Sequence, residues 1–549
     1  MKMKKKNSTT LFINTLIFFS LIQFQTSLSL SDSSTSFPKE ALPTKSGYLP
    51  ISPTSTSSIF YTFYEAKNST SPLSQTPLLI WLQGGPGCSS MVGNFYELGP
   101  YLITNSLTLQ PNHASWNRIF GLLFLDNPIG TGFSVASTLQ EIPTDQTAVA
   151  EHLFAAITRF VKLDPVFKHR PIYITGESYA GKYVPAIGYY ILEKNAKLKD
   201  FERVNLAGVA IGNGLTDPVT QMVTHADNAY YVGLINERQK NELVKAQVEA
   251  VELVERRNWS EATDARNRVL NLLQNMTGLA TLYDYSRKIP YEDYLVAKFL
   301  NIDEVRKALG VNVDESFVYE KCSHVVGAAL HADLMKSVKY MVEKLLKEGM
   351  RVLLYQGQRD LRVGVVQVEA WVKTMKWEGI VEYVNAEREI WKVNGEVAGY
   401  VQKWKSFTNV VVLGGGHLLP TDQPLNSQAM IEDWVLEKEK VDNGPWGSRE
   451  SVASEARHTL LNCVTKEIDF FFCCDLLNIR DFVKKESFEK DQSESGSAIS
   501  LNYADTSSSN YFTIAVLRTY KDFDDMGDAQ IVLLAQAITM YECINDYYI

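Results

Sequence analysis

A serine between small residues marks the most informative stretch of this 549-residue chain. Residues 176–181 read Gly-Glu-Ser-Tyr-Ala-Gly, with the serine at position 178. A run typical of a β-strand, 171–175, precedes them, and a run typical of a helix, 182–194, follows. This layout is typical of a nucleophile elbow, a tight strand-to-helix turn that exposes a serine Oγ above a sheet. The usual pattern has glycine two residues after the serine, where this chain has Ala180, and such short patterns also occur by chance.

A serine nucleophile needs a general base, and the base needs an acidic residue to orient it. On an open α/β sheet such side chains lie in loops at the carboxyl ends of strands. Two further buried-strand runs lead into candidates: 350–355 precedes Asp360, and 409–413 precedes three glycines and His417. The order Ser178, Asp360, His417 is the one that α/β-hydrolases use. An aspartate after a strand often only caps a helix, and a lone histidine is often structural, but together the three predict a catalytic triad.

An acyl-transfer site also needs N–H donors for the negative charge that develops on the carbonyl oxygen. The run 77–82 is typical of a buried strand and leads into the glycine-rich loop 83–87. Glycines let such a loop bring its backbone close to a substrate. The N–H groups of Gly85 and Tyr179 are the expected oxyanion hole, because Tyr179 directly follows the nucleophile. Without the elbow, the same loop would be interpreted as an ordinary Gly/Pro turn.

The pattern changes between about residues 217 and 336. The stretches 237–255 and 261–274 are charged and helix-like, with apolar residues three to four positions apart. We interpret this region as a helical insertion over the strand ends that forms part of the substrate cleft. Its apolar stripes could equally pack away from the site.

The first 30 residues predict a signal peptide. Four lysines near the start precede an apolar run at 11–24, and small residues near Ser29 and Ser31 suit cleavage. An uncleaved anchor is the alternative, but the run is short for a span of about 20 residues. No later segment is apolar enough to cross a membrane, so we expect a protein of the secretory pathway, extracellular or vacuolar. That route permits disulfides and glycans, and glycosylation sequons are present at Asn68, Asn258 and Asn275.

Charge divides the chain near residue 440. Residues 441–549 hold 18 acidic and 9 basic residues, so this part accounts for the whole net charge of −9. Four of the six cysteines also lie there. We therefore predict a main domain at 31–440 and a poorly ordered C-terminal extension of unknown role at 441–549. No basic patch indicates nucleic acid as a partner.

Several ordered motifs between about 45 and 440 resemble the serine carboxypeptidase family, in its plant branch near vitellogenic-like carboxypeptidases. The matching blocks are 81–90 (oxyanion and carboxylate-binding loop), 94–100, 127–134, 176–185 (nucleophile motif) and 415–424 (histidine motif). The resemblance implies an α/β-hydrolase fold, with a mixed, mostly parallel sheet flanked by helices. It also implies a serine-type carboxypeptidase that releases C-terminal residues from peptides or proteins through an acyl-enzyme, without a cofactor or a metal.

The resemblance assigns roles to individual residues. Ser178 would be the nucleophile, His417 the base and Asp360 its orienter, with oxyanion N–H groups from Gly85 and Tyr179. The substrate's terminal carboxylate would be bound by Gln83, Gly84 and Glu177, with Glu97 paired to Glu177. Cys88 and Cys322 match a family disulfide. The chain departs from many members in having Gln83 in place of asparagine and Gln358 in place of an aspartate, which affects fine specificity.

Glu177, beside the nucleophile, predicts a pH dependence. Two carboxyl groups in one site resist double ionisation, so one pKa rises. A protonated Glu177 could donate to a substrate carboxylate that an ionised one would repel, which favours activity in acid. The alternative is that Glu177 and Glu97 are ordinary polar neighbours. Two rival functions also stay open: an acyltransferase that uses activated acyl esters, and a binding protein with an inert site.

Overall fold

The computed structural model describes residues 37–312, 314, 316–436, 498–504 and 511–517. The chain divides into two units, Met1–Arg449 and Glu450–Ile549. The predicted signal peptide and most of the predicted C-terminal extension lie outside the described residues. In the second unit, β13 (Ala498–Ala504) pairs in antiparallel fashion with β14 (Tyr511–Leu517).

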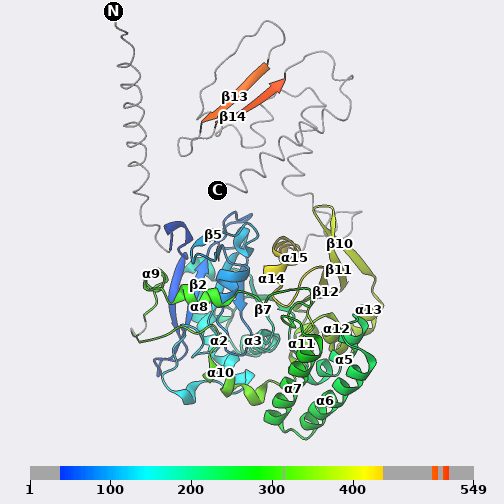
Figure 1. Ribbon diagram of the computed structural model, residues 1–549. Helices are drawn as coiled ribbons and strands as arrows, with labels where there is room; N and C mark the ends of the chain where they lie inside the picture. Colours follow the sequence, from blue (N-terminus) through cyan, green and yellow to red (C-terminus); the bar gives the residue numbers. More distant parts are fainter. Residues whose placement is uncertain (1–36, 313, 315, 437–497, 505–510, 518–549) are drawn as a thin grey trace, which may run out of the picture. The chain divides into compact units, whose positions relative to one another are not determined.

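A ten-stranded sheet forms the centre of the first unit (Figure 1). Its strands are, in spatial order, β1 (Lys45–Pro50), β2 (Ser58–Tyr64), β6 (Gly121–Leu125), β3 (Leu78–Leu82), β7 (Ile172–Glu177), β8 (Leu206–Gly212), β9 (Arg351–Gly357), β12 (Phe407–Val412), β11 (Glu396–Trp404) and β10 (Arg388–Val393). The stretch from β6 to β12 is parallel, and the two outer strands at each edge are antiparallel. The predicted mixed, mostly parallel sheet is confirmed. A separate small ladder joins β4 (Tyr101–Ile103) to β5 (Leu109–Pro111).

The sheet is buried on both faces, which explains why its strands are continuous apolar runs. Successive side chains of a strand point to opposite faces. In β3, Leu78, Ile80 and Leu82 therefore belong to one hydrophobic core. Leu79 and Trp81 belong to the other core. All five side chains are fully buried.

Helices cover both faces of the sheet, as predicted. The first core includes side chains from α2 (Gln146–Val161), α3 (Ala180–Asn195), α11 (Lys339–Lys347) and α12 (Val365–Val372). The second core includes side chains from α8 (Tyr294–Leu300), α9 (Asp303–Ala308) and α15 (Pro424–Leu436). The other short helices and helical turns are α13 (Ile380–Asn385), α14 (Leu419–Asp422), η1 (Lys39–Ala41), η2 (Gly93–Glu97), η3 (Trp116–Arg118), η4 (Leu139–Glu141), η5 (Pro165–Phe167), η6 (Asp200–Glu202) and η7 (His331–Asp333).

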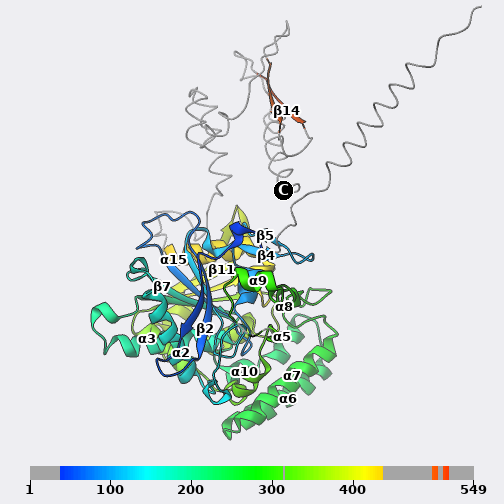
Figure 2. The ribbon, with the colours of Figure 1, turned by 90° about the vertical axis from the view of Figure 1, so that its left-hand side faces the viewer.

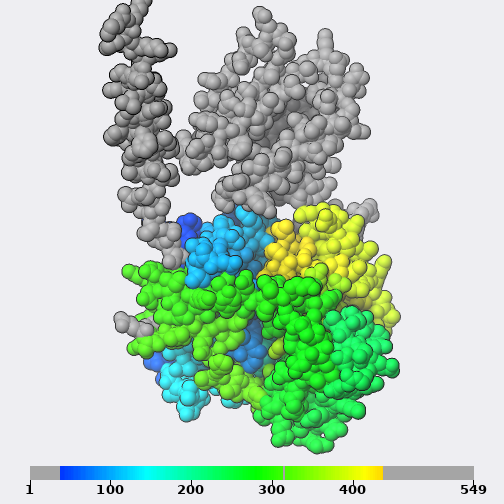
Figure 3. Space-filling model, in the orientation of Figure 1, coloured from blue at the N-terminus to red at the C-terminus, as the bar shows by residue number. Residues whose placement is uncertain are grey.

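The long connection between β8 and β9 is helical. Besides α8, α9, α11 and η7, it holds α4 (Pro218–Met222), α5 (His225–Tyr231), α6 (Glu237–Glu255), α7 (Trp259–Thr277) and α10 (His324–Ala329). A capping box between Asn236 and Gln239 starts α6. The two long helices, α6 and α7, pack side by side, as Figures 1 and 2 both show. Residues of this connection, green in Figure 3, cover much of one face of the unit. Within the part of the chain that the structure describes, none of the helices is long and apolar enough to span a bilayer.

Candidate active site

Ser178 lies in the tight turn between β7 and α3, and its φ of +62° is in the left-handed region. The turn needs glycines on both sides. A Cβ atom at Gly176 would lie 2.4 Å from the Leu82 carbonyl oxygen. At Gly181 it would lie 2.5 Å from the backbone nitrogen of Leu215. The close approach therefore falls at Gly181 rather than at Ala180, which explains how this chain departs from the usual spacing and still forms the turn.

Asp360 follows β9 and is only 1% exposed. Its Oδ2 lies 2.6 Å from Nδ1 of His417 and accepts a hydrogen bond from Nδ2 of Asn213 at 2.8 Å. Its Oδ1 accepts the backbone N–H groups of Arg362 and Val363 at 2.7 and 3.1 Å. Four donors therefore converge on one buried carboxyl group.

His417 follows β12 and is held from two sides. Besides the contact with Asp360, its backbone N–H donates to the carbonyl oxygen of Tyr283 at 2.7 Å. The ring of Tyr283 also packs against the imidazole, with 4.3 Å between centroids. Nε2 of His417 is buried and has no hydrogen-bond partner among the described residues. The two ring nitrogens are thus distinguished: Nδ1 is bound to Asp360, whereas Nε2 makes no hydrogen bond to a described residue, Ser178 included.

Three backbone N–H groups gather at the elbow. The loop after β3 packs so closely there that a Cβ at Gly84 would lie 2.6 Å from both the Glu177 carbonyl oxygen and the Tyr179 nitrogen. Gly85 has a φ of +111°, which disfavours any other residue. Within the described residues, the N–H groups of Gly84, Gly85 and Tyr179 donate no hydrogen bond. These three N–H groups are therefore available to donate to a ligand.

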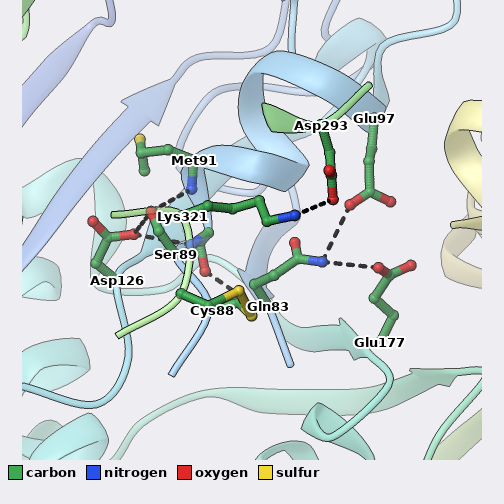
Figure 4. The surroundings of a disulfide bond; sticks show 11 residues. Gln83, Cys88, Ser89, Met91, Glu97, Asp126, Glu177, Asp293 and Lys321 are labelled. Atoms are coloured by element: carbon green, nitrogen blue, oxygen red, sulfur yellow. Dashed lines mark hydrogen bonds and ion pairs between the residues drawn. A yellow bond between two sulfur atoms is a disulfide. The ribbon is translucent and has the colours of Figure 1, made fainter. Parts of the chain in front are cut away.

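Next to the elbow, Gln83 bridges two buried carboxyl groups (Figure 4). Its Nε2 donates to Oε1 of Glu177 at 2.8 Å and to Oε1 of Glu97 at 3.2 Å. Its Oε1 accepts from Nε1 of Trp81 at 2.9 Å, which fixes which end of the amide faces the acids. Glu97 and Glu177 are each 1% exposed. Neither Oε2 atom has a donor among the described residues.

Burial raises the pKa of both glutamic acids because it disfavours their charged forms. The pKa of Glu97 rises to about 8, and the hydrogen bond from Gln83 only partly opposes this. The pKa of Glu177 rises well above its ordinary value, first through burial and then through the neighbouring charge of Glu97. Both shifts favour the protonated forms of the two acids.

Cys88 and Cys322 form the predicted disulfide, with 3.8 Å between their Cα atoms. It connects the loop after β3 to the helical connection between β8 and β9. Backbone hydrogen bonds reinforce the link, because Ser89 N–H donates to Lys321 O at 2.9 Å. On the other side, Ser89 Oγ donates to the fully buried Asp126 at 2.6 Å (Figure 4). The loop that carries the expected oxyanion donors is therefore fastened at both sides.

The sequons at Asn68, Asn258 and Asn275 are all exposed. Exposure is what an acceptor of a glycan needs, and their modification stays a prediction.

Two residues of the site were not found from the sequence. Asn213 donates to Asp360 and has a φ of +43°. Its signal was present, since an asparagine between two glycines after a strand suits the left-handed region. Tyr283, which packs on His417, lies in the helical connection, where no motif distinguishes it.

The chain belongs to the serine carboxypeptidase family, whose model matches residues 36–437. It is thus a serine-type carboxypeptidase by family, a hydrolase of the peptidase class with an α/β-hydrolase fold. It is 58% identical to "Serine carboxypeptidase-like 50" of Arabidopsis thaliana over 404 residues, which cover 73% of this chain and 89% of the relative.

More distant relatives are consistent with this. The chain is 36% identical to "Probable serine carboxypeptidase CPVL" of Homo sapiens over 414 residues, covering 73% of this chain and 85% of the relative. The crystal structure of a prohormone-processing carboxypeptidase, Kex1(delta)p of Saccharomyces cerevisiae, matches with a TM-score of 0.67 and 28% identity. That match covers 74% of this chain and 94% of the other.

Proposed function

We propose that this peptidase releases single residues from the C-termini of peptides, by acyl transfer to Ser178. The observation that carries the proposal is the pair of buried acids bridged by Gln83, Glu97 and Glu177, beside the elbow. A neutral or half-neutral acid pair with an amide is a site for a carboxylate, and the C-terminus of a peptide supplies one.

The reaction would proceed in two steps. Ser178 Oγ attacks the last peptide carbonyl while Nε2 of His417 takes its proton, and Asp360 stabilises the imidazolium through Nδ1–H. The N–H groups of Gly85 and Tyr179 stabilise the oxyanion. His417 then gives the proton to the leaving amine, and the C-terminal residue departs. A water molecule, deprotonated by His417, hydrolyses the acyl-enzyme and restores Ser178.

The substrate's terminal carboxylate would be bound by three groups: the carboxyl proton of Glu177, the N–H of Gly84 and the amide of Gln83. Since both N–H bonds of Gln83 point to the acid pair, one of them would turn to the substrate when it binds. Because the shared proton makes this site a donor, binding is strongest in acid and weakens as the pair loses the proton. Glu97 accepts from Gln83 and holds its amide in place.

The rival activity, acyl transfer from an activated ester, uses the same nucleophile. An acyl ester has no free carboxylate, so it leaves Gln83 and the acid pair without a role. Retention of that pair therefore favours the peptidase. We also propose that the protein acts in an oxidising compartment, the cell exterior or the vacuole, which the disulfide between Cys88 and Cys322 supports.

The test is release of the C-terminal residue from a mixed set of peptides, with the same peptides amidated at the C-terminus and a Ser178→Ala protein as controls. We expect release that needs the free carboxylate and is lost in the variant. If a folded protein reacts with a serine-directed phosphonate but releases no residue, the result would contradict the peptidase and favour acyl transfer.

A further inference from the structure

An arginine without a counterion lies buried in the helical connection. Arg266 on α7 is 3% exposed, and its Nε is buried without a hydrogen-bond partner among the described residues. It makes no ion pair with any described residue. Burial and the charge of Arg362 lower its pKa to about 9, and no carboxylate opposes them. An unpaired buried charge is costly, so a bound anion is its expected partner.

The ionisable groups near Arg266 do not supply the missing counterion. Lys182 is also fully buried, but its Nζ lies 2.8 Å from Asp333. His225 is 3% exposed, and burial together with the charge of Arg266 lowers its pKa to about 4, so it stays neutral. Asp360, whose charge acts on His225, is already bound by four donors. None of these groups neutralises Arg266.

Arg362 brings the positive charge to the active site. It lies two residues after Asp360, is half-buried and forms no ion pair with a described residue. Its guanidinium lies over the ring of Tyr283, 5.4 Å from the centroid. That ring packs on the imidazole of His417 at 4.3 Å. Arg362 is therefore separated from His417, the expected catalytic base, by a single aromatic ring.

We propose that Arg266 and Arg362 form a recognition site for an acidic side chain of the peptide substrate. This inference rests on the proposed carboxypeptidase function and names its substrate class: peptides with aspartate or glutamate next to the scissile bond. Arginine binds carboxylates through two parallel N–H donors, which gives both strength and direction. The side-chain carboxylate supplies the missing anion. The terminal carboxylate has its own site at Gln83 and Glu177.

The first test compares glutamate with glutamine, which differ in charge but hardly in shape. Two pairs of peptides carry the exchange at the penultimate and at the C-terminal residue, and kcat/KM is measured at about pH 5.5, where a glutamate side chain with a usual pKa of about 4.3 is ionised. We expect a preference for glutamate of roughly 10- to 100-fold at one of the two positions, the range given by a charge-assisted hydrogen bond. Equal rates for glutamate and glutamine at both positions would overturn the proposal.

The second test assigns the preference to the two arginines. In Arg266→Met and in Arg362→Gln, the glutamate-to-glutamine ratio of kcat/KM should fall towards one. Arg268→Gln is the matched control, because Arg268 lies on the same helix but is exposed and paired with Glu249. It should keep the wild-type ratio. A ratio that survives in both variants, or falls equally in the control, contradicts the assignment; if Arg266→Met does not fold, Arg362→Gln decides.

Calorimetry on the Ser178→Ala protein separates this proposal from the proposed function. Binding of the glutamate and glutamine peptides requires no turnover. Tighter binding of the glutamate peptide, without release of any residue by the wild type, would support the anion-binding site and refute the carboxypeptidase activity. Release of neutral residues, with equal binding of both peptides, would support the carboxypeptidase activity and refute the anion-binding site.

Discussion

Two acidic sites lie near the elbow, and they are equally buried but differ in the number of hydrogen-bond donors that reach them. Asp360, Glu97 and Glu177 are each 1% exposed. Four donors reach Asp360, including two backbone N–H groups and a ring nitrogen. The two glutamic acids share a single amide, that of Gln83, and each retains an oxygen with no donor among the described residues. The supply of donors, rather than burial, distinguishes the two sites.

The difference separates two tasks within one reaction. In the proposed mechanism, Asp360 orients His417 and stabilises its positive charge during proton transfer. In the same proposal, a protonated acid at Glu177 binds an anion that a carboxylate would repel. The proposal thus gives two buried carboxyl groups of one fold different tasks.

We expect the largest effect on catalysis from a substitution at Asp360. Asp360→Asn should lower kcat by about 10⁴, because an amide favours the wrong tautomer of His417, with little change in KM. Steady-state kinetics on one good peptide measures both. The matched exchange Glu177→Gln should leave kcat at acidic pH within about threefold, since its loss is one of binding. Comparable losses of kcat in both variants would refute the division of roles.

A second test uses stability. Between about pH 4.5 and 8 the folded protein retains a proton on the acid pair that the unfolded chain has released. The contribution of this pair to the free energy of unfolding is therefore largest below the unfolded pKa and falls as pH rises, by up to about 1.4 kcal/mol per pH unit for each retained proton. The melting temperature across this range measures the slope.

The double variant Glu97→Gln/Glu177→Gln should show a smaller slope than the wild type, because it has no carboxyl proton to lose there. Glu242→Gln, an exchange at an exposed helical residue paired with Arg238, is the control and should keep the wild-type slope. A slope unchanged in the double variant would contradict a shared proton.

Much of this arrangement could be predicted from the sequence, and the rest could not for physical reasons. The runs that form β7, β9 and β12 are continuous and apolar because their sheet is buried on both faces. Each strand end could therefore be located in the sequence, together with the residue that follows it: Ser178, Asp360 or His417. The disulfide came from the family resemblance. Tyr283 and Arg266 could not be found, because a helical connection has no fixed place relative to the strand ends until its apolar stripes pack.

The sequence predicted that a pKa in the acid pair would be raised, but it did not predict the main cause. The expectation rested on repulsion between two carboxyl groups, whereas burial is the larger contribution for both Glu97 and Glu177. Burial depends on η2, the turn that brings Glu97 beneath the loop after β3, and no periodicity in the sequence indicates that packing.

The most direct test of the shared proton as a binding device is the pH dependence of KM for one peptide with a free C-terminus. The peptide's own α-carboxyl group, with a usual pKa of about 3.5, stays ionised from pH 5 to 8, so a change in KM belongs to the protein. We predict that KM rises about tenfold or more over this range in the wild type, and much less in Glu177→Gln, whose amide is neutral throughout. A KM that stays constant from pH 5 to 8 in the wild type would contradict the account.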